Sequence, residues 1–173
     1  RVTLQNFVGF HFYDEGKGLI TLDWGADCLY KYQLEQPYDL NTITKIGSSS
    51  AITSLPTHLT YTPTGETFYV AYNSEFNITR YDSPEAYSLS NLLQNGTYDL
   101  SSVTDPSGGL ESMKFSSDGT TFLMMENDYD NFTTVHEYSL STAFDLNSRS
   151  YVTVHSMTDL LPVTSLFDID FDE

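Results

Sequence analysis

One polar position that recurs along the chain carries residues able to do chemistry. His11 occupies it in the first of several similar segments, and Thr60, Lys114 and Asp170 occupy it in the others. If these segments form neighbouring strands, an imidazole, an ammonium and a carboxylate would face one channel, an arrangement that suits general acid–base catalysis. The sequence contains no Gly-x-Ser-x-Gly elbow, His-Glu-x-x-His pair, phosphate-binding glycine loop or Cys-x-x-Cys pair. We therefore expect a protein that is not an enzyme, with these positions as the ones to inspect for catalysis.

Carboxylates cluster in one short segment near residue 128. Glu126, Asp128 and Asp130 alternate there, and hard oxygen ligands at such spacing suit Ca²⁺. The segment lacks the glycine and the terminal Glu of an EF-hand loop, and the other similar segments have no equivalent cluster. A solvated acidic loop is the alternative explanation. Apart from this calcium site, the sequence predicts no cofactor.

Three Asn-x-Ser/Thr acceptors, at Asn77, Asn95 and Asn131, are candidate sites for N-linked glycans. Asn77 and Asn131 lie at the same offset, 16 residues after the aromatic residue of the preceding similar segment. Glycans at equivalent positions would coat one rim of the molecule and would indicate a secreted glycoprotein. The alternative is chance, because Ser and Thr are abundant in this sequence.

Tryptophan and cysteine each occur once in the sequence. Trp24, between Asp23 and Gly25, is a candidate for stacking on a sugar ring, with core packing as the alternative. Cys28 is the only cysteine, so no disulfide can form within these residues. A lone cysteine in an apolar strand is typically a small buried hydrophobe.

The composition excludes several classes of function. The 173 residues include 24 acidic and 7 basic side chains, giving a formal net charge of −17. Such a chain lacks the clustered Lys and Arg that bind nucleic acid or an anionic membrane surface. No apolar run approaches the ~20 residues that cross a bilayer. The 13 Tyr and 11 Phe favour strands over helices.

Three segments of the sequence align without gaps: residues 10–22, 59–71 and 113–125. Each begins with alternating apolar and polar residues, reaches a glycine four positions after an aromatic residue, and continues into an apolar run. This pattern predicts a β-hairpin whose glycine supplies the positive φ of a tight turn. A second pair of strand signals closes each unit.

The spacing of these units predicts the fold. Tyr61 follows Phe12 by 49 residues, and Phe115 follows Tyr61 by 54. Four short strands in each ~50 residues are typical of β-propeller blades. We therefore predict an all-β chain forming a β-propeller or part of one, with about three four-stranded blades and the first strand of a fourth. The predicted blades are 1–50, 51–105 and 106–160, with the fourth beginning at 161–173.

Two irregularities accompany this assignment. In the second blade, an insertion around 84–94 is expected to form a short helical turn or an extended loop. At the chain's end, residues 167–173 match the start of another unit, with Phe171 placed 56 residues after Phe115. We therefore expect one domain truncated at its C-terminus. The alternative is a small ring closed by a strand at residues 2–7.

Two motifs in the third unit resemble a bacterial and viral β-propeller repeat. They are the segments 115–120, Phe-Ser-Ser-Asp-Gly-Thr, and 138–146, Tyr-Ser-Leu-Ser-Thr-Ala-Phe-Asp-Leu. Similar repeats occur in surface, secreted and virion-appendage proteins, where they act as scaffolds. The resemblance covers most of the chain and implies no catalytic residue.

Together these features predict a non-catalytic structural or interaction module at the surface of a cell or virion or outside the cell. It would act as a repeating subunit of a fibre, appendage or filament, with other protein chains or copies of itself as partners. The alternatives are a carbohydrate-binding, lectin-like propeller and a hydrolytic propeller. The hydrolytic alternative would require inward-facing carboxylates that converge in one funnel.

Overall fold

The computed structural model describes residues 6–52, 55–72, 76–101, 108–128 and 132–157, together with residues 169 and 171. The described residues form three four-stranded antiparallel sheets, as the repeat spacing predicts, and short 3-10 turns are their only helical elements. The first sheet contains β1 Phe7–Tyr13, β2 Gly18–Asp23, β3 Cys28–Leu34 and β4 Ile43–Ser48. The second contains β5 Pro56–Tyr61, β6 Thr67–Tyr72, β7 Asn77–Asp82 and β8 Leu93–Asp99. The third contains β9 Gly108–Phe115, β10 Thr121–Asp128, β11 Phe132–Leu140 and β12 Arg149–Ser156.

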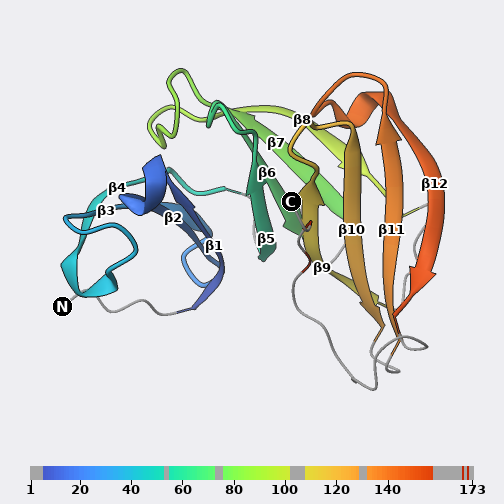
Figure 1. Cartoon of the computed structure of the whole chain (residues 1–173), viewed down its shortest axis with the longest axis horizontal. Coiled ribbons are helices and arrows are strands. Elements are labelled where there is room, and N and C mark those ends of the chain that lie inside the picture. Colours follow the sequence, from blue (N-terminus) through green and yellow to red (C-terminus); the bar gives the residue numbers. More distant parts are fainter. Residues whose placement is uncertain are drawn as a thin grey trace.

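Each sheet is a meander in which every strand pairs with the next along the chain. The first strands of the sheets are the ones that meet, because β5 packs against both β1 and β9. Figure 1 shows β5 between the blue sheet of β1–β4 and the orange sheet of β9–β12. The strands β1, β5 and β9 are therefore the inner strands, as in adjacent blades of a propeller.

Apolar layers between successive sheets form the core. Leu22, Leu59 and Val70 are fully buried between the first two sheets. Ile78 and Phe122 are fully buried between the second and third sheets. These side chains come from alternating positions of strands covered on both faces. The packing of the blades thus follows from the apolar runs that the sequence places after each turn glycine.

A glycine–aromatic contact recurs in every sheet. The turn after the inner strand contains a glycine with positive φ, as the hairpin pattern predicts. An aromatic ring from the loop before the outermost strand covers that glycine so closely that a Cβ there would lie about 2.5 Å from ring atoms. The same aromatic residue donates its backbone N–H to the glycine carbonyl. The pairs are Gly16–Tyr38, Gly65–Tyr87 and Gly119–Phe144.

The contact corrects the expectation of an insertion around 84–94. Tyr87 follows Tyr81 by six residues, as Phe144 follows Tyr138 in the third sheet. Strand β8 begins twelve residues after Tyr81, whereas β12 begins eleven after Tyr138, so the second sheet is only one residue longer here. The segment forms turns and then β8. The sequence suggested an insertion because Tyr98-Asp99-Leu100 resembles the aromatic-Asp-Leu motif that closes the other units, although Tyr98 belongs to β8.

The expected start of a fourth blade at 161–173 lies outside the described residues, except for Ile169 and Phe171. The backbone N–H of Ile169 donates to Ser112 Oγ of β9 at 3.4 Å. Residues 1–5, which include most of the alternative closing strand, also lie outside them. Within the described part of the chain, no helix has the length and apolar character needed to span a membrane.

Candidate active site

The recurring polar position of the inner strands lies at one cavity. His11 of β1, Thr60 of β5 and Lys114 of β9 all line a cavity of about 440 Å³ near the ends of these strands. The turn residue Ser116 and the aromatic Phe144 lie on its third-sheet side. Because the inner strands run side by side at equivalent register, their matching positions converge. The cavity lies within the size range of small-molecule sites.

A hydrogen bond fixes the tautomer of neutral His11. Its Nε2 lies 2.7 Å from the carbonyl oxygen of Leu59, on the neighbouring inner strand. A carbonyl only accepts, so Nε2 carries the proton and Nδ1 is the basic nitrogen of the neutral ring. The ring also packs edge-on against Tyr61, with centroids 5.2 Å apart. His11 is thus oriented by the blade next to its own.

Tyr61 is a member of the site that sequence reasoning did not single out. Its hydroxyl donates to the carbonyl oxygen of Phe12 at 2.9 Å and so bridges the first two sheets. Burial raises the pKa of Tyr61 well above its ordinary value, and neighbouring Tyr87 and Tyr13 raise it further. The phenol therefore stays neutral. The only feature of the sequence that could have indicated Tyr61 is its position, because it directly follows Thr60 in the aligned segments.

The hydroxyl of Ser116 is committed to the turn that follows β9. It donates to Asp118 Oδ1 at 2.7 Å and accepts from the backbone N–H of Thr121 at 2.9 Å. Hydrogen bonds from the backbone N–H of Thr120 and from Ser116 hold the pKa of Asp118 below its ordinary value. The hydroxyl of Ser116 therefore stabilises the turn, and Asp118, whose pKa is lowered, is a weak base for activating it as a nucleophile.

The described lining of the cavity contains one imidazole and one ammonium but no carboxylate. Asp170, the carboxylate expected at this position, lies outside the described residues. The described lining therefore lacks the paired carboxylates that glycoside hydrolysis uses. A histidine that accepts a proton and a lysine that stabilises negative charge instead suit the addition of water to a carbonyl carbon.

The predicted calcium ligands are only partly within the described structure. Glu126 is buried in β10, where its Oε2 lies 3.0 Å from Nε2 of His136. Asp128 ends β10 with its side chain outside the described part, and Asp130 lies outside it entirely. The described residues contain no group of three His, Cys, Asp or Glu side chains that would hold a metal ion. The calcium site stays a prediction.

The buried Glu126–His136 pair is itself a feature that the sequence did not predict. Glu126 shares a face of β10 with Met124, which packs in the core between the second and third sheets. Their remaining atoms, Glu126 Oε1 and His136 Nδ1, are buried without a hydrogen-bond partner among the described residues, as is the hydroxyl of Tyr138. Dispersed histidines gave no indication that one would meet a carboxylate across a strand pair.

The remaining predicted sites lie on separate parts of the fold. Asn77 begins β7 and is half-buried, whereas Asn95 is exposed on β8, where its amide donates to Asp82. Asn131 lies outside the described residues. Trp24 is 46% exposed in the turn after β2, and Cys28 is buried at the start of β3. Glycosylation and sugar stacking at these positions stay predictions.

Several solved structures resemble the fold. A candidate 6-phosphogluconolactonase from Bacteroides uniformis aligns over 86% of this chain and 40% of its own, with 16% identity and a TM-score of 0.58. The periplasmic gluconolactonase of Pseudomonas aeruginosa aligns over 86% and 40%, with 18% identity and a TM-score of 0.51. The Cps50 (Swd1) β-propeller domain of Myceliophteria thermophila aligns over 86% and 42%, with 14% identity and a TM-score of 0.53.

These likenesses establish the fold class, an all-β chain arranged as part of a β-propeller. The chain spans about 40% of the length of these structures. No family model and no curated protein matches the sequence. Propeller domains in general mediate interactions between proteins, which agrees with the expected class of partner.

The comparisons correct two expectations from the sequence. We expected a non-catalytic structural module and a protein that is not an enzyme, yet several of the similar propellers are named as lactonases, which are hydrolytic enzymes. The alternative of a hydrolytic propeller fits this finding better. The sequence led to the expectation of a non-catalytic module because it carries no local catalytic motif. A propeller, however, can assemble a site from single residues on separate blades.

Proposed function

We propose that this chain forms part of a hydrolytic β-propeller that opens the cyclic ester of a sugar-derived acid. The observation that carries the proposal is the meeting of His11 and Lys114, from two different inner strands, at one cavity. The names of the lactonase-like propellers support the choice of substrate class. The part of the chain described here supplies one side of the site.

The chemistry assigned to the site is the addition of water to the lactone carbonyl. Nδ1 of His11 accepts a proton from water as the water oxygen forms a bond to the carbonyl carbon. The ammonium of Lys114 stabilises the negative charge that develops on the carbonyl oxygen. When the tetrahedral intermediate collapses, the ring C–O bond breaks and the leaving alkoxide takes the proton back from the imidazolium. The product is the open hydroxy acid.

The test is hydrolysis of D-glucono-δ-lactone by the purified chain, followed by proton release at constant pH and corrected for the spontaneous reaction. We expect acceleration by the wild-type chain and a loss of about 100-fold or more in His11→Gln. Glutamine can still donate to the Leu59 carbonyl but cannot accept the proton. The matched control is His155→Gln, since His155 is 49% exposed on β12 and bonds to Glu137.

Two results would contradict the proposal. One is a wild-type rate equal to the spontaneous rate with the lactone and with a simple activated ester such as p-nitrophenyl acetate. The other is a His11→Gln variant that hydrolyses the lactone as fast as the wild type and His155→Gln do. Each result concerns the chemistry at the cavity and leaves the fold unaffected.

A further inference from the structure

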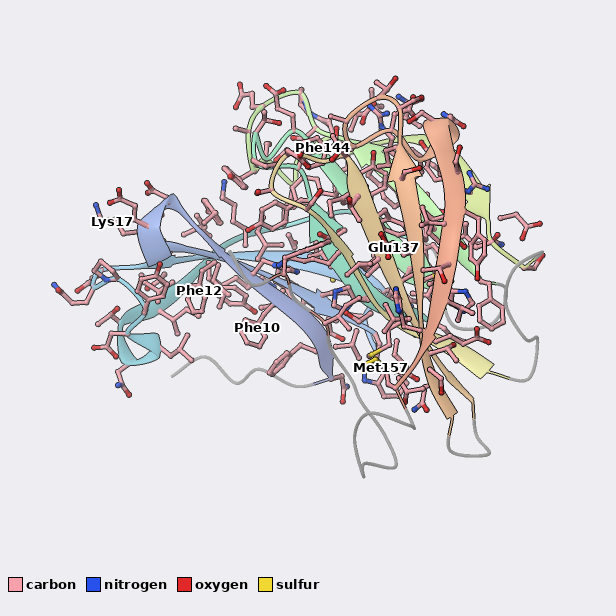
Figure 2. All side chains as sticks on the ribbon, turned by 45° about the vertical axis from the view of Figure 1, so that its right-hand side comes forward. Phe10, Phe12, Lys17, Glu137, Phe144 and Met157 are labelled. Carbon is pink, nitrogen blue, oxygen red and sulfur yellow. The ribbon has the colours of Figure 1, made fainter. Side chains whose placement is uncertain are left out.

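A second cavity lies beside the candidate active site, between the second and third sheets. Its volume is about 440 Å³, and it shares Pro63 and Phe144 with the cavity that His11 and Lys114 line. Figure 2 shows Phe144 at the upper end of the third sheet. From there the second cavity extends to Arg80 of β7, the third strand of its sheet, and we call it the outer cavity. The cavity of His11 and Lys114 is then the inner cavity.

The outer cavity lies where the matching interface of the first two sheets is filled by aromatic rings. There Tyr13 stacks on Tyr87, with ring centroids 4.3 Å apart. In the aligned segments Thr62 takes the place of Tyr13, and Phe144 takes the place of Tyr87. Both Thr62 and Phe144 line the outer cavity. The smaller side chain of Thr62 thus leaves open a space that a tyrosine fills at the neighbouring interface.

Hydroxyl groups are the main polar feature of the outer cavity. They come from Thr62, Thr64, Thr67 and Thr142. The hydroxyls of Thr62 and Thr64 lie 3.1 Å apart, and a hydroxyl can donate one hydrogen bond while it accepts others. The ring of Phe144 adds an apolar surface beside them. Hydroxyls next to an aromatic ring suit a sugar, which carries hydroxyls at its edge and C–H groups on its faces.

The charges of the outer cavity favour a neutral ligand. Arg80 Nε donates to Asp82 Oδ1 at 2.7 Å, and Thr67 donates to the same oxygen at 3.2 Å. Burial opposes ionisation of Asp82, but hydrogen bonds from Arg80 and Asn95 hold the pKa of Asp82 below its ordinary value. The Asp82 carboxylate therefore neutralises the guanidinium, and Asp145 adds a second carboxylate to the lining. A phosphate or carboxylate ligand would meet more negative than positive charge here.

We propose that the outer cavity holds a second sugar residue, so that the substrate is the lactone of a disaccharide. This inference rests on the proposed function, because the lactone ring itself would occupy the inner cavity. Pro63 and Phe144, which line both cavities, would lie beside the link between the two rings. Contacts with the second sugar are remote from the reacting carbon, and such contacts can supply binding energy that positions the lactone for attack.

The experiment compares the hydrolysis of cellobiono-δ-lactone and maltobiono-δ-lactone with that of D-glucono-δ-lactone. We expect kcat/KM to be about 10-fold or more higher for at least one disaccharide lactone. Thr62→Tyr introduces the residue that fills the matching interface, so it should bring the ratio of disaccharide to monosaccharide kcat/KM close to one. Thr44→Tyr is the matched control, since Thr44 is exposed on β4 of the first sheet, and it should keep the wild-type ratio.

Three results would overturn the inference while leaving the proposed function intact. They are equal kcat/KM for all three lactones in the wild type, a preference that Thr62→Tyr does not change, and a preference that Thr44→Tyr abolishes equally. Urea unfolding establishes that both variants fold.

If no lactone is hydrolysed, the proposed function fails, and calorimetric titration with cellobiose and maltose then tests the outer cavity by itself. We expect the wild type and Thr44→Tyr to bind at least one of these sugars, and Thr62→Tyr to bind it about 10-fold more weakly or not at all. A wild-type chain that binds neither sugar, or a Thr62→Tyr variant that binds as the wild type does, would show that the outer cavity is not a sugar site.

Discussion

Replacing His136 with leucine is expected to lower the free energy of unfolding by about 3–5 kcal/mol. The reason is the carboxylate left behind. Glu126 is 3% exposed, and its Oε2 bonds to His136 while its Oε1 has no partner among the described residues. Without His136, the buried side chain of Glu126 would lose the hydrogen-bond partner of its Oε2. Urea unfolding of the wild type and the variant at neutral pH measures the loss.

The double variant Glu126→Met with His136→Leu distinguishes this explanation from simple loss of packing. Replacing both members of a buried polar pair with apolar residues is often neutral or stabilising. We therefore expect the double variant to recover most of the stability lost in His136→Leu. If the double variant is as unstable as the single one, or if His136→Leu costs less than about 1 kcal/mol, the pair does not hold the role assigned to it.

Replacing Gly119 with alanine is expected to destabilise the protein by about 2–4 kcal/mol. Gly119 has a φ of +71°, which is unfavourable for a residue with a Cβ, and the added atom would lie 2.4 Å from Cε2 of Phe144. The ring cannot easily withdraw, since Phe144 donates its N–H to the Gly119 carbonyl at 2.9 Å and its ring packs against the core. Thermal unfolding monitored by circular dichroism measures the effect.

Gly47 provides the matched control for this substitution. Gly47 lies in β4, where an added Cβ would meet only Cβ of Lys31 at 3.9 Å, an ordinary contact. Gly47→Ala should therefore change the stability by less than about 1 kcal/mol. If Gly47→Ala and Gly119→Ala lower the unfolding midpoint equally, the glycine–aromatic contact is not what makes Gly119 necessary.

The sequence predicted the sheets because their signals are local. Alternation over 10–22, 59–71 and 113–125 places the inner strands, and the turn glycines fix the hairpins. The same alternation singled out His11 and Lys114, because matching positions on neighbouring strands must converge. The sequence did not reveal the role of Tyr87, because its contact with Gly65 depends on how the loop folds back and not on any periodic pattern.

The candidate chemistry was harder to predict than the scaffold. Nothing local to His11 reveals that the carbonyl of Leu59, 48 residues away, sets its tautomer. The Glu126–His136 pair likewise arises only from the register of β10 against β11, in which Met124 lies opposite His136. A site assembled from single residues on separate blades would leave no motif in the sequence, which is why the sequence favoured a non-enzyme over the hydrolytic alternative that the names of similar propellers support.

The strictly sequential strand order has a consequence for how the protein is made. Because each strand pairs with its immediate neighbour along the chain, nearly all backbone pairing joins residues close in sequence. The strand pairing within such a sheet needs nothing synthesised after its own fourth strand. The β1–β4 sheet can therefore pair while β5 is still in the ribosome, with Leu22 exposed until Leu59 arrives. Slow translation beyond residue 48 would prolong that exposure and favour binding by chaperones.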